Sequence, residues 1–225
     1  KRYTNFAIES SLNTLEGTVN FGNMCSCIIQ KNGDLLHKMV LELEIKCSDY
    51  IRLETVVYNN AYAFIDYVEV QIAGQTIDKQ YGEWLYIWSE LTQDASKKLV
   101  LQEMLRPTIE DPAKPHIGVV QIPLNFWFNK DIGSSFPLIS LQHQDLRLNV
   151  RFTELSKVWN NLLAKEHHTA GDLTLKISDH NLYCDYIYLE SDERRRFSQT
   201  KQEYLIEQVQ FSRDTIPKGA STAAG

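Results

Sequence analysis

The 225-residue sequence is poor in cysteine, proline and glycine, and it contains no long apolar run. Four cysteines are too few for a disulfide scaffold and favour a reducing compartment. No uninterrupted apolar stretch approaches the roughly 20 residues that a membrane-spanning helix needs. Basic residues are also in deficit, 23 against 29 acidic ones, so we do not expect a surface that binds nucleic acid by neutralising phosphates.

The remaining composition is that of an ordinary folded chain, with 43% hydrophobic and 23% charged residues. Aromatic and β-branched residues are frequent, and the apolar pattern mostly repeats every second residue, which is typical of strands. Residues 39–46 (MVLELEIK) and 62–73 (YAFIDYVEVQIA) show this alternation best. About nine strands are expected, the others at 17–21, 25–30, 118–123, 138–142, 146–153, 173–188 and 204–211.

Glycine-containing dipeptides predict two of the turns. Asn32-Gly33 lies between two alternating runs and predicts a hairpin, because both residues tolerate a positive φ. Gly74 predicts a tight turn between residues 68–72 and a short strand at Thr76 and Ile77.

Three segments break the strand pattern and predict helices. Residues 81–91 place Trp84, Leu85, Trp88 and Leu91 on one helical stripe. A second helix is expected at 95–105, ended by Arg106-Pro107, and a third at 155–165.

Many alternating strands with a few helices indicate two packed antiparallel sheets, either a jelly roll or an immunoglobulin-like sandwich. The length and the long insert between the strands near 77 and 118 favour the jelly roll. We therefore predict an all-β, eight-stranded antiparallel jelly-roll sandwich at 1–213, with a helical insert at about 79–115. Residues 214–225 are small and without apolar periodicity, so they read as a linker. The start at Lys1, without a leader segment, favours an excised piece of a longer chain.

Candidate chemistry is sparse. Cys25 and Cys27 would share one face of a strand and are interpreted as small core residues, since their spacing does not suit zinc. His143, His167 and His168 lack the spacing of a cupin metal site, and 166–171 reads as a polar loop. No nucleophile elbow or phosphate-binding glycine loop occurs. Four carboxylates, Glu42, Glu44, Asp66 and Glu69, are assigned to the wet side of strands.

Two further clusters can be interpreted either as purely structural or as functional. The run Arg194 to Arg196 is either a solvated corner or a contact to an acidic neighbour. Trp84 and Trp88 at helical spacing favour a packing stripe over a platform for sugars.

Longer strings are more specific than any of these motifs. They are 2–9 (RYTNFAIE), 32–35 (NGDL), 68–78 (VEVQIAGQTID), 81–85 (YGEWL), 126–129 (FWFN) and 136–142 (FPLISLQ). In this order they resemble the major capsid proteins of nucleocytoplasmic large DNA viruses. The residues that carry the resemblance are Gly33, Asp34, Gly74, Asp78, Trp84, Phe126, Trp127, Phe128, Pro137, Leu138 and Leu141.

The resemblance implies a double jelly roll, of which this chain would be the first sandwich, with 214–225 leading to the second. It implies homotrimers that form pseudo-hexagonal capsomers and tile an icosahedral shell, with minor capsid proteins as further partners. The location would be the virion, assembled in the host cytoplasm. No enzyme activity, cofactor, nucleic-acid partner or membrane span is expected.

Physical roles can be assigned to the resembling residues as well. Gly33 and Gly74 supply turn conformations, and Asp34 and Asp78 are expected to accept hydrogen bonds from local backbone amides. In a strand, residues 126–128 would turn at least one aromatic ring away from the core, toward a helical insert or an adjoining jelly roll. Trp84 and Trp88 would fix the insert helix to a sheet.

Two rival functions remain open. A jelly-roll lectin is suggested by the aromatic content, and a cupin-like metal enzyme by His143, His167 or His168. For a shell protein, the segments 79–115 and 156–171 are candidates for intersubunit or outward-facing surface.

Overall fold

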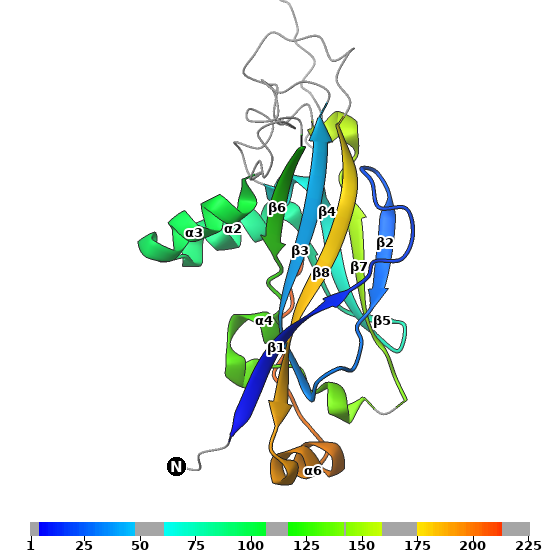
Figure 1. The fold of residues 1–225 in the computed structure, drawn as a ribbon, viewed down its shortest axis with the longest axis vertical. Coiled ribbons are helices and arrows are strands. Elements are labelled where there is room, and N and C mark those ends of the chain that lie inside the picture. The colour runs from blue at the N-terminus through cyan, green and yellow to red at the C-terminus, as the bar shows by residue number, and fades with distance from the viewer. Residues whose placement is uncertain (1–4, 48–60, 107–116, 142, 159–174, 213–225) are drawn as a thin grey trace, which may run out of the picture.

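The computed structural model describes residues 5–47, 61–106, 117–141, 143–158 and 175–212. Its eight described strands form two four-stranded antiparallel sheets, ordered β1-β8-β3-β6 and β2-β7-β4-β5 (Figure 1). Successive strands mostly switch between the two sheets, which is the jelly-roll connection, so the predicted fold is confirmed. The strands are β1 (Phe6–Asn13), β2 (Met24–Ile28), β3 (Leu35–Cys47), β4 (Ile65–Ile72), β5 (Gln75–Tyr81), β6 (Ile117–Pro123), β7 (Leu146–Phe152) and β8 (Leu175–Leu189).

The core lies between the two sheets and is built by strict alternation. On β3, Leu41, Leu43 and Ile45 are fully buried, whereas Glu42 and Glu44 between them remain half-buried on the outer side. Cys25 and Cys27 on β2 are also buried, which confirms their interpretation as core residues. Burial raises the pKa of the Cys25 thiol to about 12 and that of Cys27 to about 11, so both stay protonated at neutral pH.

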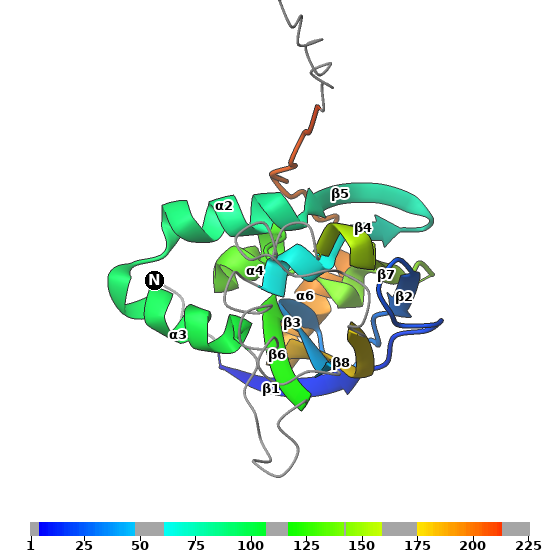
Figure 2. The ribbon, with the colours of Figure 1, turned by 90° about the horizontal axis from the view of Figure 1, so that it is seen from above.

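Two helices project from the side of the sandwich next to β6 (Figures 1 and 2). They are α2 (Gly82–Thr92) and α3 (Ala95–Leu105), close to the ranges that the sequence predicts. Asp94 caps α3 by accepting a hydrogen bond from the Ala95 amide at 3.1 Å. Of the third predicted helix, residues 155–158 are helical, and the rest lies outside the described residues. No described helix is both long and apolar enough to cross a bilayer.

Three predicted strands are wrong. Residues 17–21 contain no strand; next to them, Glu16 forms a single bridge to Ser26. Residues 138–140 form a 3-10 helix, η3 (Leu138–Ser140), and 204–211 have no regular structure. Conversely, β1 was not predicted. Alternation in these short segments reflects local packing, which periodicity cannot distinguish from strand pairing.

The predicted hairpin at Gly33 is also wrong, because β2 and β3 belong to different sheets and the chain crosses between them there. Gly33 does not have a positive φ, and the need for glycine comes instead from close packing. A Cβ at this position would lie 2.7 Å from the Tyr186 Cβ.

The turn at Gly74 is confirmed. Ala73 and Gly74 have φ values of 51° and 79°, and Ile72 pairs with Gln75, which makes a two-residue hairpin loop between β4 and β5. Two successive positive φ values define the type I′ turn that suits the twist of the flanking strands.

Gly82, the first residue of α2, generates a stability prediction. A Cβ there would clash with the backbone carbonyl oxygens of Ile65, the first residue of β4, and of Tyr62 in the 3-10 helix η1 (Ala61–Phe64) that precedes it. Neither oxygen can move without displacing the backbone of these elements. Gly82→Ala should therefore cost about 2 kcal/mol or more of unfolding free energy in denaturant melts. Gly74→Ala is the control: its Cβ meets nothing within 4 Å, so only the positive φ is penalised, by about 1 kcal/mol. Equal losses in the two variants would contradict the clash.

Candidate functional site: an aromatic corner and a clamped C-terminal segment

The three successive aromatics at 126–128 are all buried, so the prediction that one ring faces outward is wrong. They form the start of a short helix, α4 (Trp127–Lys130), rather than a strand. In a helical turn, successive side chains point in different directions around the axis, and here all three aromatic side chains are buried in the core. Trp127 is only 5% exposed, and its ring lies 4.9 Å from that of Phe128 in an edge-to-face arrangement. Phe136 packs 5.8 Å from Phe128 and completes the cluster.

Buried polar groups hold this helix against β3. The Asn129 side-chain oxygen accepts a hydrogen bond from the Phe126 amide at 3.0 Å, which caps the helix. The Asn129 side-chain nitrogen donates to the carbonyl oxygen of His37, and His37 Nδ1 lies 3.2 Å from the carbonyl oxygen of Phe128. These bonds fix both the distance of α4 from β3 and the orientation of the helix about its own axis. We call the cluster of Phe126, Trp127, Phe128 and Phe136 the aromatic corner.

Asp34 joins three distant parts of the chain. This carboxylate is 4% exposed and accepts hydrogen bonds from the Leu189 amide and from Arg194 Nε, both at 2.8 Å. The prediction of local amide partners is wrong, because Asp34 lies where the chain crosses between the sheets and faces the end of β8. Arg194 belongs to α6 (Ser191–Gln199), so the bond also fixes this helix to the sandwich.

Several of the resembling residues meet at this corner. Phe136 and Leu36 exchange two backbone hydrogen bonds of 2.8 Å, and Pro137 then leads into η3. The corner forms a shallow pocket of about 300 Å³. Its lining includes Gly33, Asp34, Leu138, Leu141 and Arg194.

Asp78 performs a similar task on β5, again with a distant partner rather than a local amide. One of its oxygens accepts a hydrogen bond from the Val209 amide at 3.1 Å, and the other accepts from Gln80 at 2.8 Å. Gln80 also donates to the carbonyl oxygen of Asn125, at 2.9 Å, next to the aromatic corner. The C-terminal segment 200–212 is therefore clamped beside β5.

Two further contacts fix the C-terminal segment. Lys130 of α4 forms an ion pair with Glu207, which lowers the pKa of that carboxyl group. The ring of Phe211 lies 4.5 Å from the ring of Tyr81.

The helix α2 meets the sandwich through Leu85, which is 1% exposed, and α3 through Leu105, which is 5% exposed, rather than through the tryptophans. Trp84 and Trp88 are only half-buried, and their rings lie 5.8 Å apart. Lys130 Nζ sits 4.2 Å from the centre of the Trp88 ring. The prediction that both tryptophans fix the helix to a sheet is thus corrected: Leu85 is the buried anchor, because α2 extends past the sheet edge.

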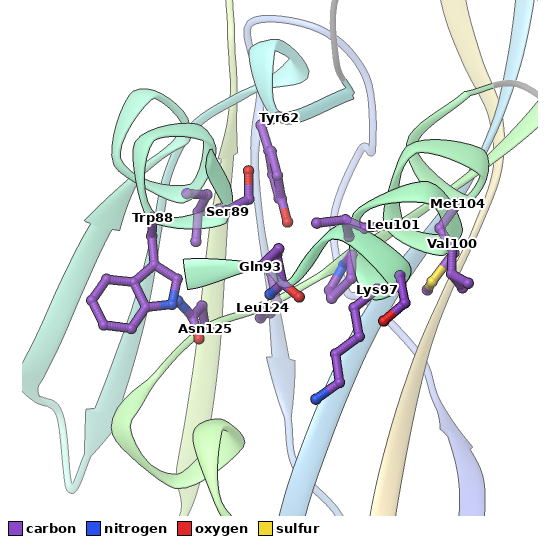
Figure 3. Close-up of a pocket in the computed structure, with 13 residues that line it drawn as sticks. Tyr62, Trp88, Ser89, Gln93, Lys97, Val100, Leu101, Met104, Leu124 and Asn125 are labelled. Atoms are coloured by element: carbon purple, nitrogen blue, oxygen red, sulfur yellow. The ribbon is translucent and has the colours of Figure 1, made fainter. Parts of the chain in front are cut away.

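A groove of about 370 Å³ lies between α2 and α3. Figure 3 shows Tyr62 reaching between the helices, with Trp88 on the α2 side and Lys97 on the α3 side. Most of the remaining lining is apolar: Leu85, Val100, Leu101, Met104, Pro123 and Leu124.

The other candidate residues are dispersed. His143 is exposed, and His167 and His168 lie outside the described residues. Within the described ranges, no three His, Cys, Asp or Glu side chains are grouped as metal ligands. Glu69, assigned to the wet side of its strand, is instead 9% exposed and accepts a hydrogen bond from Asn149.

Comparison with known proteins identifies the family. A family model described as the major capsid protein N-terminus matches residues 1–190. The chain belongs to the major capsid protein family. It is 38% identical to the major capsid protein of Pyramimonas orientalis virus over 95% of this chain and 52% of that protein. It is also 34% identical to the major capsid protein of Paramecium bursaria Chlorella virus 1, over 100% of this chain and 49% of that protein.

Solved capsid structures share the fold. A chain of the PBCV-1 virus capsid superposes with a TM-score of 0.75 at 32% identity, covering 94% of this chain and 49% of that one. The Faustovirus major capsid protein, at 10% identity, superposes with a TM-score of 0.59, a likeness of fold alone. The chain thus spans about half the length of the curated capsid proteins that it matches.

The aromatic corner generates the next prediction. Trp127→Ala should lower the unfolding free energy by about 3 to 5 kcal/mol, because it removes a large buried ring and leaves a cavity beside Phe128 and Phe136. Denaturant melts measure the loss. Leu205→Ala is the matched control, since that side chain is 94% exposed and should change stability little. A loss below about 1 kcal/mol for Trp127→Ala would refute its burial.

The Asp34 junction generates another. Asp34→Ala should cost about 2 to 3 kcal/mol, because it leaves the Leu189 amide without its acceptor and Arg194 without its partner. Asp34→Asn should cost less, since its amide oxygen can still accept one of these bonds. Thermal melts of both variants decide the matter; equal losses would show that the hydrogen bonds are not what Asp34 contributes.

Proposed function

We propose that this chain is the first of two jelly rolls in a structural protein that builds the shell of a large DNA virus. The observation that supports this most directly is the family match over residues 1–190, together with the eight-stranded fold shared with the PBCV-1 capsid chain. Residues 1–213 act as the jelly-roll domain, and 214–225 as the linker toward a second one. The curated relatives are about twice as long as this chain, which supports that division.

In the proposed assembly, three copies form a pseudo-hexagonal capsomer, and capsomers tile an icosahedral shell inside the virion. Many small symmetric contacts sum to a stable shell while allowing wrongly placed subunits to dissociate. Minor capsid proteins are further proposed partners, and the host cytoplasm is the proposed place of assembly. This role needs rigid corners and repeated surfaces rather than a catalytic centre. The buried junctions at Asp34, Asp78 and Asn129 supply rigid corners.

The residues that carry the family resemblance are proposed to act as structural supports in this role. Gly33, Asp34, Leu138 and Leu141 line one corner pocket. Phe126, Trp127 and Phe128 pack together beside it. Both groups hold the segments at one end of the sandwich, α4 and α6, against the strands.

The native mass of the full natural chain tests the proposal. We expect a denatured mass of roughly twice 26.0 kDa and a native mass three times larger, measured by light scattering and by native mass spectrometry. Negative-stain images should then show hexagonal outlines. A monomer that fails to associate at any concentration would contradict the proposal, and a glycan array would then test the lectin alternative.

A further inference from the structure

One outer face of the sandwich combines carboxylates with exposed apolar side chains. Residues paired directly across an antiparallel sheet point to the same side, and alternate residues of a strand share a face. Because Leu41 and Leu43 point into the core, Glu42 and Glu44 point outward, together with the Asp179 that pairs with Glu44. We call this outer side of the sheet β1-β8-β3-β6 the acidic face. Its defining residues are Phe6, Ile8, Leu12, Glu42, Glu44, Asp179 and Asp185.

The charge of this face is concentrated in its middle. Glu42 accepts hydrogen bonds from Gln121 at 2.9 Å and from Asn181 at 3.1 Å, so its carboxylate is held at the surface in one position. The pKa of Tyr183 is raised chiefly by the negative charge of Glu42. Lys46 and Lys176 lie opposite each other at one end of these strands, and Lys46 Nζ forms an ion pair with Glu44 at 3.4 Å. Among the described residues, Glu42, Asp179 and Asp185 form no ion pair and therefore carry the remaining negative charge of the face.

Exposed apolar side chains border the carboxylates on β1. Phe6, Ile8 and Leu12 are 55%, 49% and 50% exposed, although they lie in a regular strand. An apolar strip on a soluble surface, flanked by polar groups, is characteristic of a protein interface.

The strand that carries this strip is also an unprotected edge. The other three edge strands are covered by their own chain: β6 packs against α3, β2 is bridged by Glu16, and β5 is clamped through Asp78. Among the described residues, β1 has no backbone partner besides β8. Its sequence contains neither lysine nor proline, the residues that usually protect edge strands. In the part of the chain that the structure describes, one edge is therefore left open beside the acidic face.

The path of the described chain indicates what does not cover this face. Val209 and Phe211 lie beside β5, and Figure 2 shows this last described segment on the opposite side of the sandwich from β1. The relatives extend to about twice this length, so a continuation after residue 212 sets out from the far side.

The opposite outer face has the reverse charge. Outward positions on β7 and β5 carry Arg147, Arg151 and Lys79. The carboxylate among them, Glu69, is 9% exposed and already hydrogen-bonded. The C-terminal segment occupies the β5 side of this face, where Phe211 packs on Tyr81. The β2 and β7 side therefore offers the basic and partly apolar surface, with Met24 beside Arg151 and Ile28 beside Arg147. Such a surface complements the acidic face.

We propose that the acidic face is the surface on which a second copy of the full natural chain docks, through a basic and apolar counter-surface. The inference rests on the proposed self-assembly and specifies where it occurs. Contact between two different surfaces, one acidic and one basic, can close into a ring, as a trimer requires. The charges orient the encounter, and the β1 strip supplies the apolar area that holds the complex.

Charge reversal in the full natural chain tests this docking. The variant Glu42→Lys with Glu44→Lys should weaken association at least about tenfold, because it places basic groups against a basic counter-surface. Light scattering over a concentration series measures the native mass. The matched control, Glu103→Lys with Glu203→Lys, makes the same charge change at side chains that are 77% and 86% exposed away from this face. It should assemble like the wild type.

A second variant guards against misfolding, since Glu42 also makes hydrogen bonds within the sheet. Ile8→Lys removes a half-exposed apolar side chain and places a basic group against the basic counter-surface, so it should likewise lower the native mass while leaving the melting temperature nearly unchanged.

The outcomes separate the inference from the proposed function. If the wild type assembles and both acidic-face variants assemble equally well, the docking surface is wrong and the capsid role stands. If the variants lower the melting temperature but not the native mass, the face packs within one chain, which also overturns the docking of a second copy. A wild type that never associates removes the proposed function itself.

Discussion

The alternation of side chains along β3 is the constraint on which the rest of the structure depends. This strand pairs with both β6 and β8 and supplies the centre of its sheet. Its inward residues are fully buried, so a shift of one residue would bring Glu42 and Glu44 into the core and Leu41 and Leu43 into water. The pairing of β3 with β8 shifts in register between Leu36 and Met39, and both of these residues are buried. The inner core and the chemistry of the outer face are thus two results of one pattern.

The ends of the sandwich are closed by a different principle, the placement of single buried polar groups. Asn129, Asp34 and Asp78 each bind backbone groups far away in the chain, where apolar contacts alone would leave orientation undetermined. Each bond is made in a site from which water is mostly excluded, so an imperfect alternative packing would leave a donor or acceptor unpaired. These junctions favour a single arrangement of the corners, which suits a protein proposed to be repeated many times in one shell.

Much of the fold is predictable from the local sequence pattern. The rest is not predictable in this way, and the physical reason can be stated. Long alternating segments such as β3 and the helix α3 follow directly from the order of their own residues. The segments 138–141 and 204–211 look equally regular, yet neither forms a ladder of backbone hydrogen bonds: residues 138–140 form η3, and residues 208–211 are held beside β5 through side chains. Whether a short apolar run becomes a strand depends on a partner elsewhere in the chain.

The candidate site shows the same division. Family resemblance directs attention to Gly33, Asp34 and Asp78, but local turn chemistry assigns them the wrong partners. The hydrogen-bond partners of Asp34 are Leu189 and Arg194, which lie 155 and 160 positions further along the chain. No motif in a single sequence reveals contacts over such separations. Asn129 is noticed in the sequence only as the last residue of the resembling string 126–129, and nothing local indicates its bond to His37, which spans 92 positions. The sequence shows Arg194 only as part of a charged run. It does not indicate whether such a run is solvated or paired with an acidic side chain.

The clamp on the C-terminal segment has a mechanical consequence. Residues 207–211 run beside β5 without forming a ladder of backbone bonds with it; they are attached through Glu207, Gln208, Val209 and Phe211. A load applied to the chain at residue 212 therefore reaches these attachments one at a time, as in peeling, and meets them before any strand of the sheet. Tension between neighbouring parts of a larger assembly would be relieved by this segment lifting away, while the eight strands keep their register.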